Sequence, residues 1–310
     1  MKIIKNTTEF YIEEATAVAI GKFDGFHCGH QKLLQRIQEQ KEKGLATVVF
    51  TFVPSPAAFF NKETVKDLTT IEEKRTIFER AGIDYLIEYP FYQEIADMEP
   101  EIYIKEVLAE RIHAKCIVAG EDVSFGCHGA GNYRLLEEKS KTYGYDVIVI
   151  DKVQYDGKEV SSTYVREEVA KGNMELVHRL LGIPYHVGGV IVHGRKLGRT
   201  LGMPTINQIP SAAKLLPPKG VYYSYVMYGG RKLPSITNIG IKPTIADSLA
   251  MGVETYIYDF NEEVYGEEID VFLLSYRRPE MRFDSVEGLK QKMAEDIASG
   301  RKYHGLNELC

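Results

Sequence analysis

The pattern of apolar residues changes near Gly182-Ile183-Pro184, and this change divides the 310-residue chain into two halves. In the first half, short apolar runs alternate with stretches of helical periodicity. The expected strands are residues 15–20, 45–52, 85–89, 116–119 and 147–150, and the expected helices are 31–43, 71–81, 101–112, 133–143 and 167–181. Because such alternation is typical of parallel strands joined by crossover helices, this half predicts an α/β domain with a parallel sheet and helices on both faces.

The second half has the pattern of an antiparallel β domain. Its β-rich runs are separated by glycine or proline turns and cover residues 185–193, 221–228, 235–239, 253–258 and 268–274. A helix is expected over 284–298, with Asp284 or Ser285 as its N-cap. This half therefore predicts an antiparallel barrel or sandwich with a terminal helix. We place the two domains at residues 1–183 and 184–310, each long enough to bury its own core.

Composition narrows the class of protein. The hydrophobic content of 44% and charged content of 26% are ordinary for a globular protein. A net charge of −6 disfavours nucleic-acid binding, which needs a concentrated basic face. No apolar run approaches the roughly 20 residues that span a membrane, and residues 1–7 lack the apolar core of a signal peptide. The four cysteines form no C-x-x-C pair, so we expect a cytoplasmic protein, with no obligate protein partner evident.

One glycine-broken segment follows the first expected strand and precedes the first expected helix: Gly21-Lys22-Phe23-Asp24-Gly25-Phe26-His27-Cys28-Gly29-His30. The free N–H groups and positive dipole at the start of a helix favour an anion, and the glycines permit close approach of the backbone. His27 and His30, three residues apart, can face one ligand. Phosphate binding is one interpretation. Ordinary surface or core histidines, and ligands of a transition metal, are the alternatives.

Three further segments stand at expected strand ends, where ligands gather in parallel sheets: 51–56, 120–126 and 160–166. Taken alone, the first is a rigid proline-rich turn and the second a polar glycine-rich loop. In the third, the hydroxyls at a helix start match a simple N-cap. Each segment thus has an ordinary structural explanation.

In the second half, Gly194, Gly198 and Gly202 recur at four-residue intervals among three basic residues, one of them Lys196. Backbone N–H groups in such a loop could cradle phosphates, although the order of residues is not that of a Walker motif. Thr205 and Asn207 would share one face of an extended chain, and their oxygens suit Mg²⁺. A basic surface loop is the alternative.

Taken together, these segments resemble the motifs of bacterial bifunctional riboflavin kinase/FAD synthetases. The first half is similar to their nucleotidylyltransferase domain through G-x-F-D-G-x-H-x-G-H at 21–30 and the segments at 51–56, 120–126 and 160–166. The second half resembles their riboflavin kinase domain through 194–207, 218–222, 237–244, 252–255 and 278–283. The resemblance covers nearly all of residues 15–300, and its motifs occur in the family's order.

The resemblance implies that the first domain binds ATP and FMN. The implied contacts to ATP are Gly21, Phe23, Asp24, Gly25, Gly29, Ser162 and Thr163, with His27, His30 and Arg166 as catalytic residues on the phosphates. Asp122 and Phe125 would shape the flavin pocket. The phosphate of FMN would attack the α-phosphorus of ATP and release pyrophosphate. Since that phosphate is already an anion, the site needs hydrogen-bond donors rather than a general base.

For the second domain, the resemblance implies phosphorylation of riboflavin. Glu254 would accept the proton of the riboflavin 5′-hydroxyl as that oxygen attacks the γ-phosphorus of ATP. The implied ATP contacts are Gly194, Lys196, Gly198 and Gly202, the implied Mg²⁺ ligands are Thr205 and Asn207, and the implied flavin contacts are Arg278 and Phe283.

We therefore expect Mg²⁺ as cofactor, the ligands riboflavin, FMN, ATP and FAD, and neither nucleic acid nor membrane as partner. One alternative is an enzyme in which a single half is active. Another is a non-catalytic sensor of flavin or nucleotide. A nucleotidyltransferase that modifies nucleic acid is disfavoured by the acidic charge balance.

Overall fold

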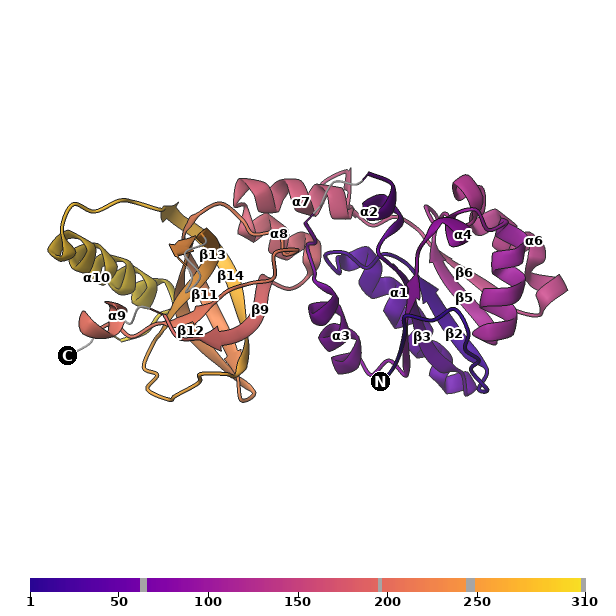
Figure 1. Cartoon of the computed structure of the whole chain (residues 1–310), viewed down its shortest axis with the longest axis horizontal. Helices are drawn as coiled ribbons and strands as arrows, with labels where there is room; N and C mark the ends of the chain where they lie inside the picture. Colours follow the sequence, from indigo (N-terminus) through magenta and orange to yellow (C-terminus); the bar gives the residue numbers. More distant parts are fainter. Residues whose placement is uncertain (62–65, 195–196, 244–248, 308–310) are drawn as a thin grey trace. The chain divides into compact units, whose positions relative to one another are not determined.

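The computed structural model describes residues 1–61, 66–194, 197–243 and 249–307. The chain forms two compact units, Met1–Ser162 and Thr163–Cys310, each with its own sheet (Figure 1). Helices α7 (Ser162–Lys171) and α8 (Met174–Leu181) lead from the first unit's last residue to the first strand of the second sheet. The boundary expected between residues 183 and 184 stays a prediction.

The first unit contains a six-stranded sheet in which every pair of neighbouring strands is parallel. The strands are β1 (Lys2–Lys5), β2 (Thr16–Ile20), β3 (Ala46–Val53), β4 (Tyr85–Pro90), β5 (Ala114–Gly120) and β6 (Asp146–Ile150). Their order is β1-β4-β3-β2-β5-β6, so the chain leaves β2 toward β3 and later returns to its other side with β5. Such a reversal opens a crevice for ligands at the carboxyl ends of the two strands.

Helices cover both faces of this sheet. Successive residues of β2 point to opposite faces, so each face of the strand packs against a different set of helices. Ala17 and Ala19 pack with α1 (Cys28–Glu39) and α3 (Ile71–Arg80). Val18 and Ile20 pack on the opposite side with the π-helix η2 (Tyr103–Arg111) and α6 (Tyr133–Tyr143). The expected α/β architecture is confirmed.

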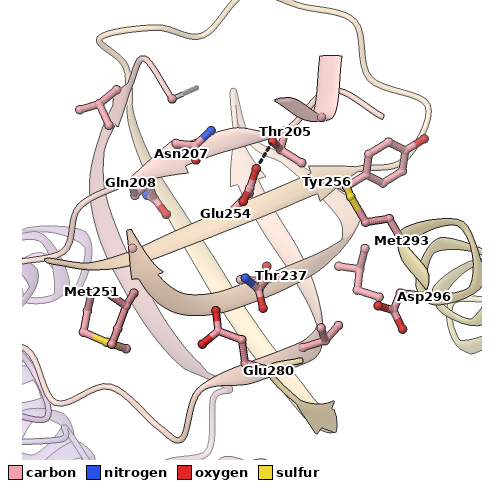
Figure 2. A pocket seen from close by; sticks show the side chains of 18 of the residues that line it. Thr205, Asn207, Gln208, Thr237, Met251, Glu254, Tyr256, Glu280, Met293 and Asp296 are labelled. Atoms are coloured by element: carbon pink, nitrogen blue, oxygen red, sulfur yellow. Dashed lines mark hydrogen bonds between the residues drawn. The ribbon is translucent and has the colours of Figure 1, made fainter. Parts of the chain in front are cut away.

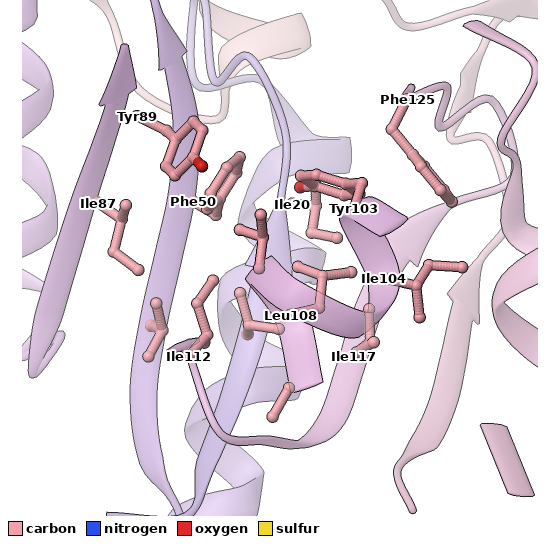
Figure 3. Close-up of a cluster of buried hydrophobic side chains, with 14 of the residues drawn as sticks. Ile20, Phe50, Ile87, Tyr89, Tyr103, Ile104, Leu108, Ile112, Ile117 and Phe125 are labelled. Atoms are coloured by element: carbon pink, nitrogen blue, oxygen red, sulfur yellow. The ribbon is translucent and has the colours of Figure 1, made fainter. Parts of the chain in front are cut away.

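Aromatic rings pack together with aliphatic side chains in the core beside η2 (Figure 3). The ring of Tyr103 lies 5.8 Å from that of Phe50 and 5.2 Å from that of Phe125. Tyr103 is only 2% exposed, and its hydroxyl has no hydrogen-bond partner within the described ranges. Burial raises the pKa of this hydroxyl. A polar group without a partner in such a place is destabilising.

The second unit is a closed antiparallel barrel. Of the two folds that the sequence allowed, a barrel or a sandwich, the structure therefore shows the barrel. Its strands are β9 (Tyr185–Val192), β10 (Ile206–Gln208), β11 (Gly220–Tyr228), β12 (Arg231–Pro243), β13 (Leu249–Ile257) and β14 (Glu268–Pro279). They close in the order β10-β13-β12-β11-β14-β9. The terminal helix α10 (Val286–Tyr303) begins after Ser285, whose hydroxyl accepts a hydrogen bond from the N–H of Gly288 at 3.1 Å. Ser285 rather than Asp284 is thus the N-cap.

Four hydroxyl groups form a chain of hydrogen bonds across three barrel strands. Ser235 Oγ lies 2.7 Å from Ser224 Oγ, which lies 2.8 Å from Thr237 Oγ1, and this atom lies 2.9 Å from Thr255 Oγ1. All four residues are fully buried. Each hydroxyl in the chain therefore satisfies a neighbour that would otherwise be buried without a partner.

Several short elements were not expected. They are α2 (Pro56–Asn61), α4 (Gln93–Ala96), the 3₁₀ segment η3 (Cys127–Gly129), the hairpin of β7 (Gln154–Tyr155) and β8 (Lys158–Glu159), α9 (Leu197–Thr200), and strands β1 and β10. The 3₁₀ segment η1 (Gln40–Lys43) and helix α5 (Pro100–Ile102) lie at the ends of the helices expected over 31–43 and 101–112. The helix expected over 167–181 is in fact the pair α7 and α8, which Gly172 separates with a φ of +76°. Glycine adopts this left-handed conformation readily, so it ends the first helix.

Candidate functional sites

The turn after β2 has an unusual backbone. Phe23, Gly25 and Phe26 have φ values of +50°, +85° and +48°, in a region of backbone conformation that residues other than glycine rarely adopt. The rings of Phe23 and Phe26 pack at 5.4 and 6.0 Å from that of Phe78 on α3, and this packing stabilises the turn. Strain of this kind is often found at functional sites. Its effect here is to start α1 directly after His27.

His27 and His30 stack on each other with their ring centroids 3.8 Å apart. A Cβ at Gly29 would lie 3.1 Å from His27 Nδ1, so the glycine leaves room for this ring. Both Nδ1 atoms are buried, and neither has a hydrogen-bond partner among the residues the structure describes. The structure thus brings the two imidazoles together, and the expectation that both face one ligand stays a prediction.

Burial keeps both rings neutral at pH 7. It lowers the pKa of His27 from 6.5 to about 4, although the charges of Asp122, Asp24 and Glu159 act in the opposite direction. Burial also lowers the pKa of His30 well below its ordinary value, and the nearby His27, Lys74 and Lys22 lower it further. A neutral imidazole has one N–H donor and one acceptor. An incoming polyphosphate would favour the protonated form and so strengthen donation.

Asp24 holds the turn in place. Its side chain is fully buried, and Oδ1 accepts hydrogen bonds from the N–H groups of Leu68 at 2.8 Å and Thr69 at 3.2 Å. Its backbone carbonyl accepts a bond of 2.7 Å from the hydroxyl of Ser162. Asp24 and Ser162 are thus joined to each other, and their expected direct contacts to phosphate stay predictions.

Two lysines add positive charge beside His30. Lys74 on α3 is 9% exposed and donates from Nζ to the backbone carbonyl of Lys22 at 3.1 Å. Lys22 Nζ lies 3.7 Å from Asp24 Oδ2. Sequence reasoning missed both as site residues. Lys22 stands within the motif and could have been found, whereas Lys74 is distant in sequence and gave no signal.

The loop after β5 brings Asp122 near His27, as the strand order requires. The carboxylate folds back onto the strand end, because a Cβ at Gly120 would lie 2.7 Å from Asp122 Oδ1. Phe125 is 3% exposed and belongs to the core, where it exchanges backbone hydrogen bonds of 3.1 and 2.9 Å with Gly131. Its ring therefore supports the loop from the core side. The flavin contacts of both residues stay predictions.

The remaining residues expected in this site need separate mention. A Cβ at Gly21 would lie 3.1 Å from the ring of Phe23, so the close approach there favours glycine. Thr163 and Arg166 lie on α7 within the second unit. Their contribution to a triphosphate site stays a prediction.

In the second unit, a cavity of about 1290 Å³ opens beside β10, β13 and α10 (Figure 2). Pockets for a single drug-sized ligand usually measure roughly 300–1,000 Å³. The cavity is therefore larger than the usual pocket for one such ligand.

Glu254 on β13 lies at the centre of the polar part of this cavity. Its Oε1 accepts a hydrogen bond from Thr205 Oγ1 at 2.7 Å (Figure 2). Asn207 on β10 is the register partner of Glu254 and lines the cavity with it. The structure thus brings together a carboxylate, a hydroxyl and an amide whose oxygens suit a hard cation.

The glycine-rich segment packs closely on these side chains. A Cβ at Gly194 would lie 2.6 Å from Asn207 Nδ2, and one at Gly198 would lie 3.2 Å from Thr205 Oγ1. Both glycines line the cavity, whereas Gly202 has a φ of +78° and serves a turn. Lys196 lies outside the described residues.

Both residues expected at the flavin, Arg278 and Phe283, line the cavity. Sequence reasoning missed other lining residues, namely His193, Met251, Tyr256, Tyr265, Met293 and Asp296. The last two lie on α10, and no local pattern in that helix distinguished them. Methionine side chains adapt well to flat polarizable ligands.

Within the described ranges, no group of three or more His, Cys, Asp or Glu residues is arranged to hold a metal ion. His27 and His30 thus have no such third ligand there, and the interpretation of this pair as a transition-metal site loses its support. Thr205, Asn207 and Glu254 offer oxygen atoms of the type that Mg²⁺ shares with substrate phosphates.

Comparison with known proteins matches each unit to an enzyme domain. A model of FAD synthetase matches residues 10–164, and a model of riboflavin kinase matches residues 181–304. The bifunctional riboflavin kinase/FMN adenylyltransferase of Escherichia coli is 34% identical over 96% of this chain and 95% of its own length. The chain belongs to this family. The bifunctional enzyme of Buchnera aphidicola is 36% identical over 99% of the chain and the whole of its own length.

This flavin enzyme also resembles a solved structure over nearly its full length. A Streptococcus pneumoniae chain described as a macrolide-efflux protein matches with a TM-score of 0.81, 30% identity, and coverage of 96% of this chain and 98% of its own. The family assignment rests on the two domain models and on the curated relatives. In the part of the chain that the structure describes, no helix is long and apolar enough to cross a membrane.

Proposed function

We propose that the two sites act in sequence on one flavin. The barrel phosphorylates riboflavin to FMN, and the α/β unit transfers the adenylyl group of ATP to FMN, giving FAD and pyrophosphate. Membership in the bifunctional family supports both activities. The observation that carries the residue assignment is the convergence of Glu254, Thr205 and Asn207 in one large cavity.

In the barrel, the nucleophile is an alcohol, so the reaction needs a proton acceptor. We assign this role to Glu254, which Thr205 orients through the bond of 2.7 Å. The riboflavin 5′-oxygen forms a bond to the γ-phosphorus of ATP and gives its proton to the carboxylate. The bond from that phosphorus to the bridging oxygen breaks, and ADP leaves. Gly194 and Gly198 give the phosphates access to backbone N–H groups.

We assign Mg²⁺ to Thr205 and Asn207, together with ATP. Both supply oxygen atoms on the cavity wall, and both lie beside the carboxylate of Glu254. When bound, the ion neutralises charge on the transferred phosphoryl group. The two side chains hold the nucleotide so that its γ-phosphorus faces the hydroxyl of riboflavin.

In the α/β unit, the nucleophile is the phosphate of FMN, which is already an anion. The task there is to align two anions and to stabilise charge at the α-phosphorus of ATP. We assign this to His27 and His30 at the start of α1, with Lys22 and Lys74 as further positive charges. The new bond joins the FMN phosphate to the α-phosphorus, and pyrophosphate leaves with the electron pair of the broken bond.

Incubation of the purified chain with riboflavin, ATP and Mg²⁺, followed by chromatography of the flavins, tests the proposal. We expect FMN to form first and FAD to follow, with release of pyrophosphate. A sensor would yield none of these products. A chain with an inactive α/β unit would stop at FMN, and one with an inactive barrel would make FAD only from supplied FMN.

We also propose that the enzyme acts in the cytoplasm. Its substrate ATP is made there, and among the described residues no disulfide joins Cys28, Cys116 or Cys127, as expected in a reducing compartment.

A further inference from the structure

A β-bulge lies at the end of β14 that borders the cavity. Val221 of β11 pairs with Arg278, but the next residue, Tyr222, pairs with Tyr276. Arg277 is therefore the extra residue of a bulge. Bulges of this kind redirect side chains and are common next to active sites.

The bulge allows two consecutive arginines to bind one carboxylate. In a regular strand, neighbouring side chains point to opposite faces. Here Arg277 Nε donates to Asp296 Oδ1 at 2.9 Å, while Arg278 Nε donates to Oδ1 at 3.1 Å and to Oδ2 at 3.0 Å. Asp296 comes from α10 and is 5% exposed. A buried carboxylate between two guanidinium groups is fully compensated, and removal of its charge would leave two cations together.

The two arginines differ in what else they contact. Arg278 and Asp296 line the cavity, and Arg278 also donates from Nη1 to the carbonyl of Pro279 at 2.9 Å. Arg277 Nη1 instead donates to the hydroxyl of Tyr223 at 2.7 Å. Arg278 is thus fixed at both ends of its guanidinium group, on the wall of the substrate cavity.

We propose that Asp296 is a positioning residue for riboflavin. It holds the guanidinium group of Arg278 in one orientation, with Arg277 as the second cation that keeps the buried carboxylate in place. A guanidinium group has five N–H donors. In Arg278, three of these donors bond Asp296 and the carbonyl of Pro279. Among the described residues the other two have no partner, and we assign them to carbonyl or hydroxyl oxygens of the flavin. The inference rests on the proposed kinase function of the barrel.

The primary test is Asp296→Asn, measured by steady-state kinetics with each substrate varied in turn. We expect KM for riboflavin to rise about tenfold, in line with the loss of one charge-assisted contact. KM for ATP and kcat should stay within about twofold, because the contacts to ATP and the base are intact. Conversion of supplied FMN to FAD should not change.

Asp259→Asn is a matched control. Asp259 forms an ion pair of 3.1 Å with Arg301, which lies on α10 as Asp296 does, but Asp259 does not line the cavity. If Asp296 served only to anchor α10, both variants would lower Tm and alter riboflavin kinetics alike, and the proposal would be wrong. An unchanged KM for riboflavin in Asp296→Asn would also overturn it.

Direct binding separates this inference from the proposed function. Quenching of riboflavin fluorescence reports its Kd whether or not turnover occurs. Failure of the unaltered chain to phosphorylate riboflavin would refute the kinase function, whereas a Kd unchanged by Asp296→Asn would refute the positioning role. If Asp296→Asn does not fold, Arg278→Lys retains the charge without the planar group. It must then weaken riboflavin binding for the inference to stand.

Discussion

The two candidate sites present opposite chemistry. The site of the α/β unit presents neutral, stacked imidazoles and lysines beside a helix start, and these groups suit the binding of anions. The barrel pocket presents a carboxylate that a neighbouring hydroxyl orients. The difference follows the nucleophile, because an alcohol must lose a proton during attack and a phosphate ester has already lost its own.

The largest expected effect comes from Glu254→Gln. The amide keeps the size of the side chain but cannot take up a proton, so riboflavin phosphorylation should fall by roughly 10²–10⁴-fold. FAD formation from supplied FMN should be unchanged. Separate assays with riboflavin and with FMN measure the two rates. Loss of both rates in a folded variant would contradict the assignment of one chemistry to each pocket.

His27→Ala tests the other pocket. Removal of a donor to the transferring phosphate should lower FAD formation by roughly 10²–10³-fold, while FMN accumulates from riboflavin at the normal rate. His27→Asn, which retains a donor, is the graded control. If FAD formation survived in His27→Ala, the imidazole pair would not be the site of phosphate binding.

The buried imidazole also predicts a pH dependence of stability. The pKa of His27 is about 4 when folded and 6.5 when unfolded, so the unfolded chain binds more protons between these values. The free energy of unfolding therefore falls as pH drops from 6.5 to 4, by up to roughly 3 kcal/mol for this group. Denaturant titrations at pH 7 and 4.5 should show a smaller fall in His27→Asn than in the unaltered chain. An equal fall would place the folded pKa of His27 near its ordinary value.

The smallest effect is expected from Tyr103→Phe. This change removes a buried hydroxyl that has no partner in the described part of the chain, while the ring stays packed between Phe50 and Phe125. We expect the free energy of unfolding to rise by about 1 kcal/mol, with both activities retained. Chemical denaturation measures the change. A decrease would show that the hydroxyl is hydrogen-bonded in solution.

The sequence predicted the architecture because both halves follow simple periodicities. The β2–α1 segment showed an apolar run, glycines and then helical spacing, and the structure follows that order. The closed barrel could not be distinguished from a sandwich, because β10 has only three residues and depends on pairing with β9 and β13. Short strands of this kind are defined by long-range contacts rather than by local pattern.

Candidate residues were predictable where they formed a motif. Thr205, Asn207 and Glu254 met in the cavity as the resemblance implied. Lys74 and Asp296 were not predictable, since each reaches its site from a distant helix on which a single charge looks like any other surface residue. The sequence also did not reveal that Asp24 is buried, with its carboxylate accepting hydrogen bonds from the backbone N–H groups of Leu68 and Thr69.

The chain of hydroxyls inside the barrel limits how that domain can evolve. Ser224 bonds both Ser235 and Thr237, so its replacement by an apolar residue deprives two neighbours of a partner at once. A fully apolar interior would require several simultaneous substitutions, each of which is harmful alone. Mutational drift in this lineage should therefore conserve the set as a block, or exchange it as a block.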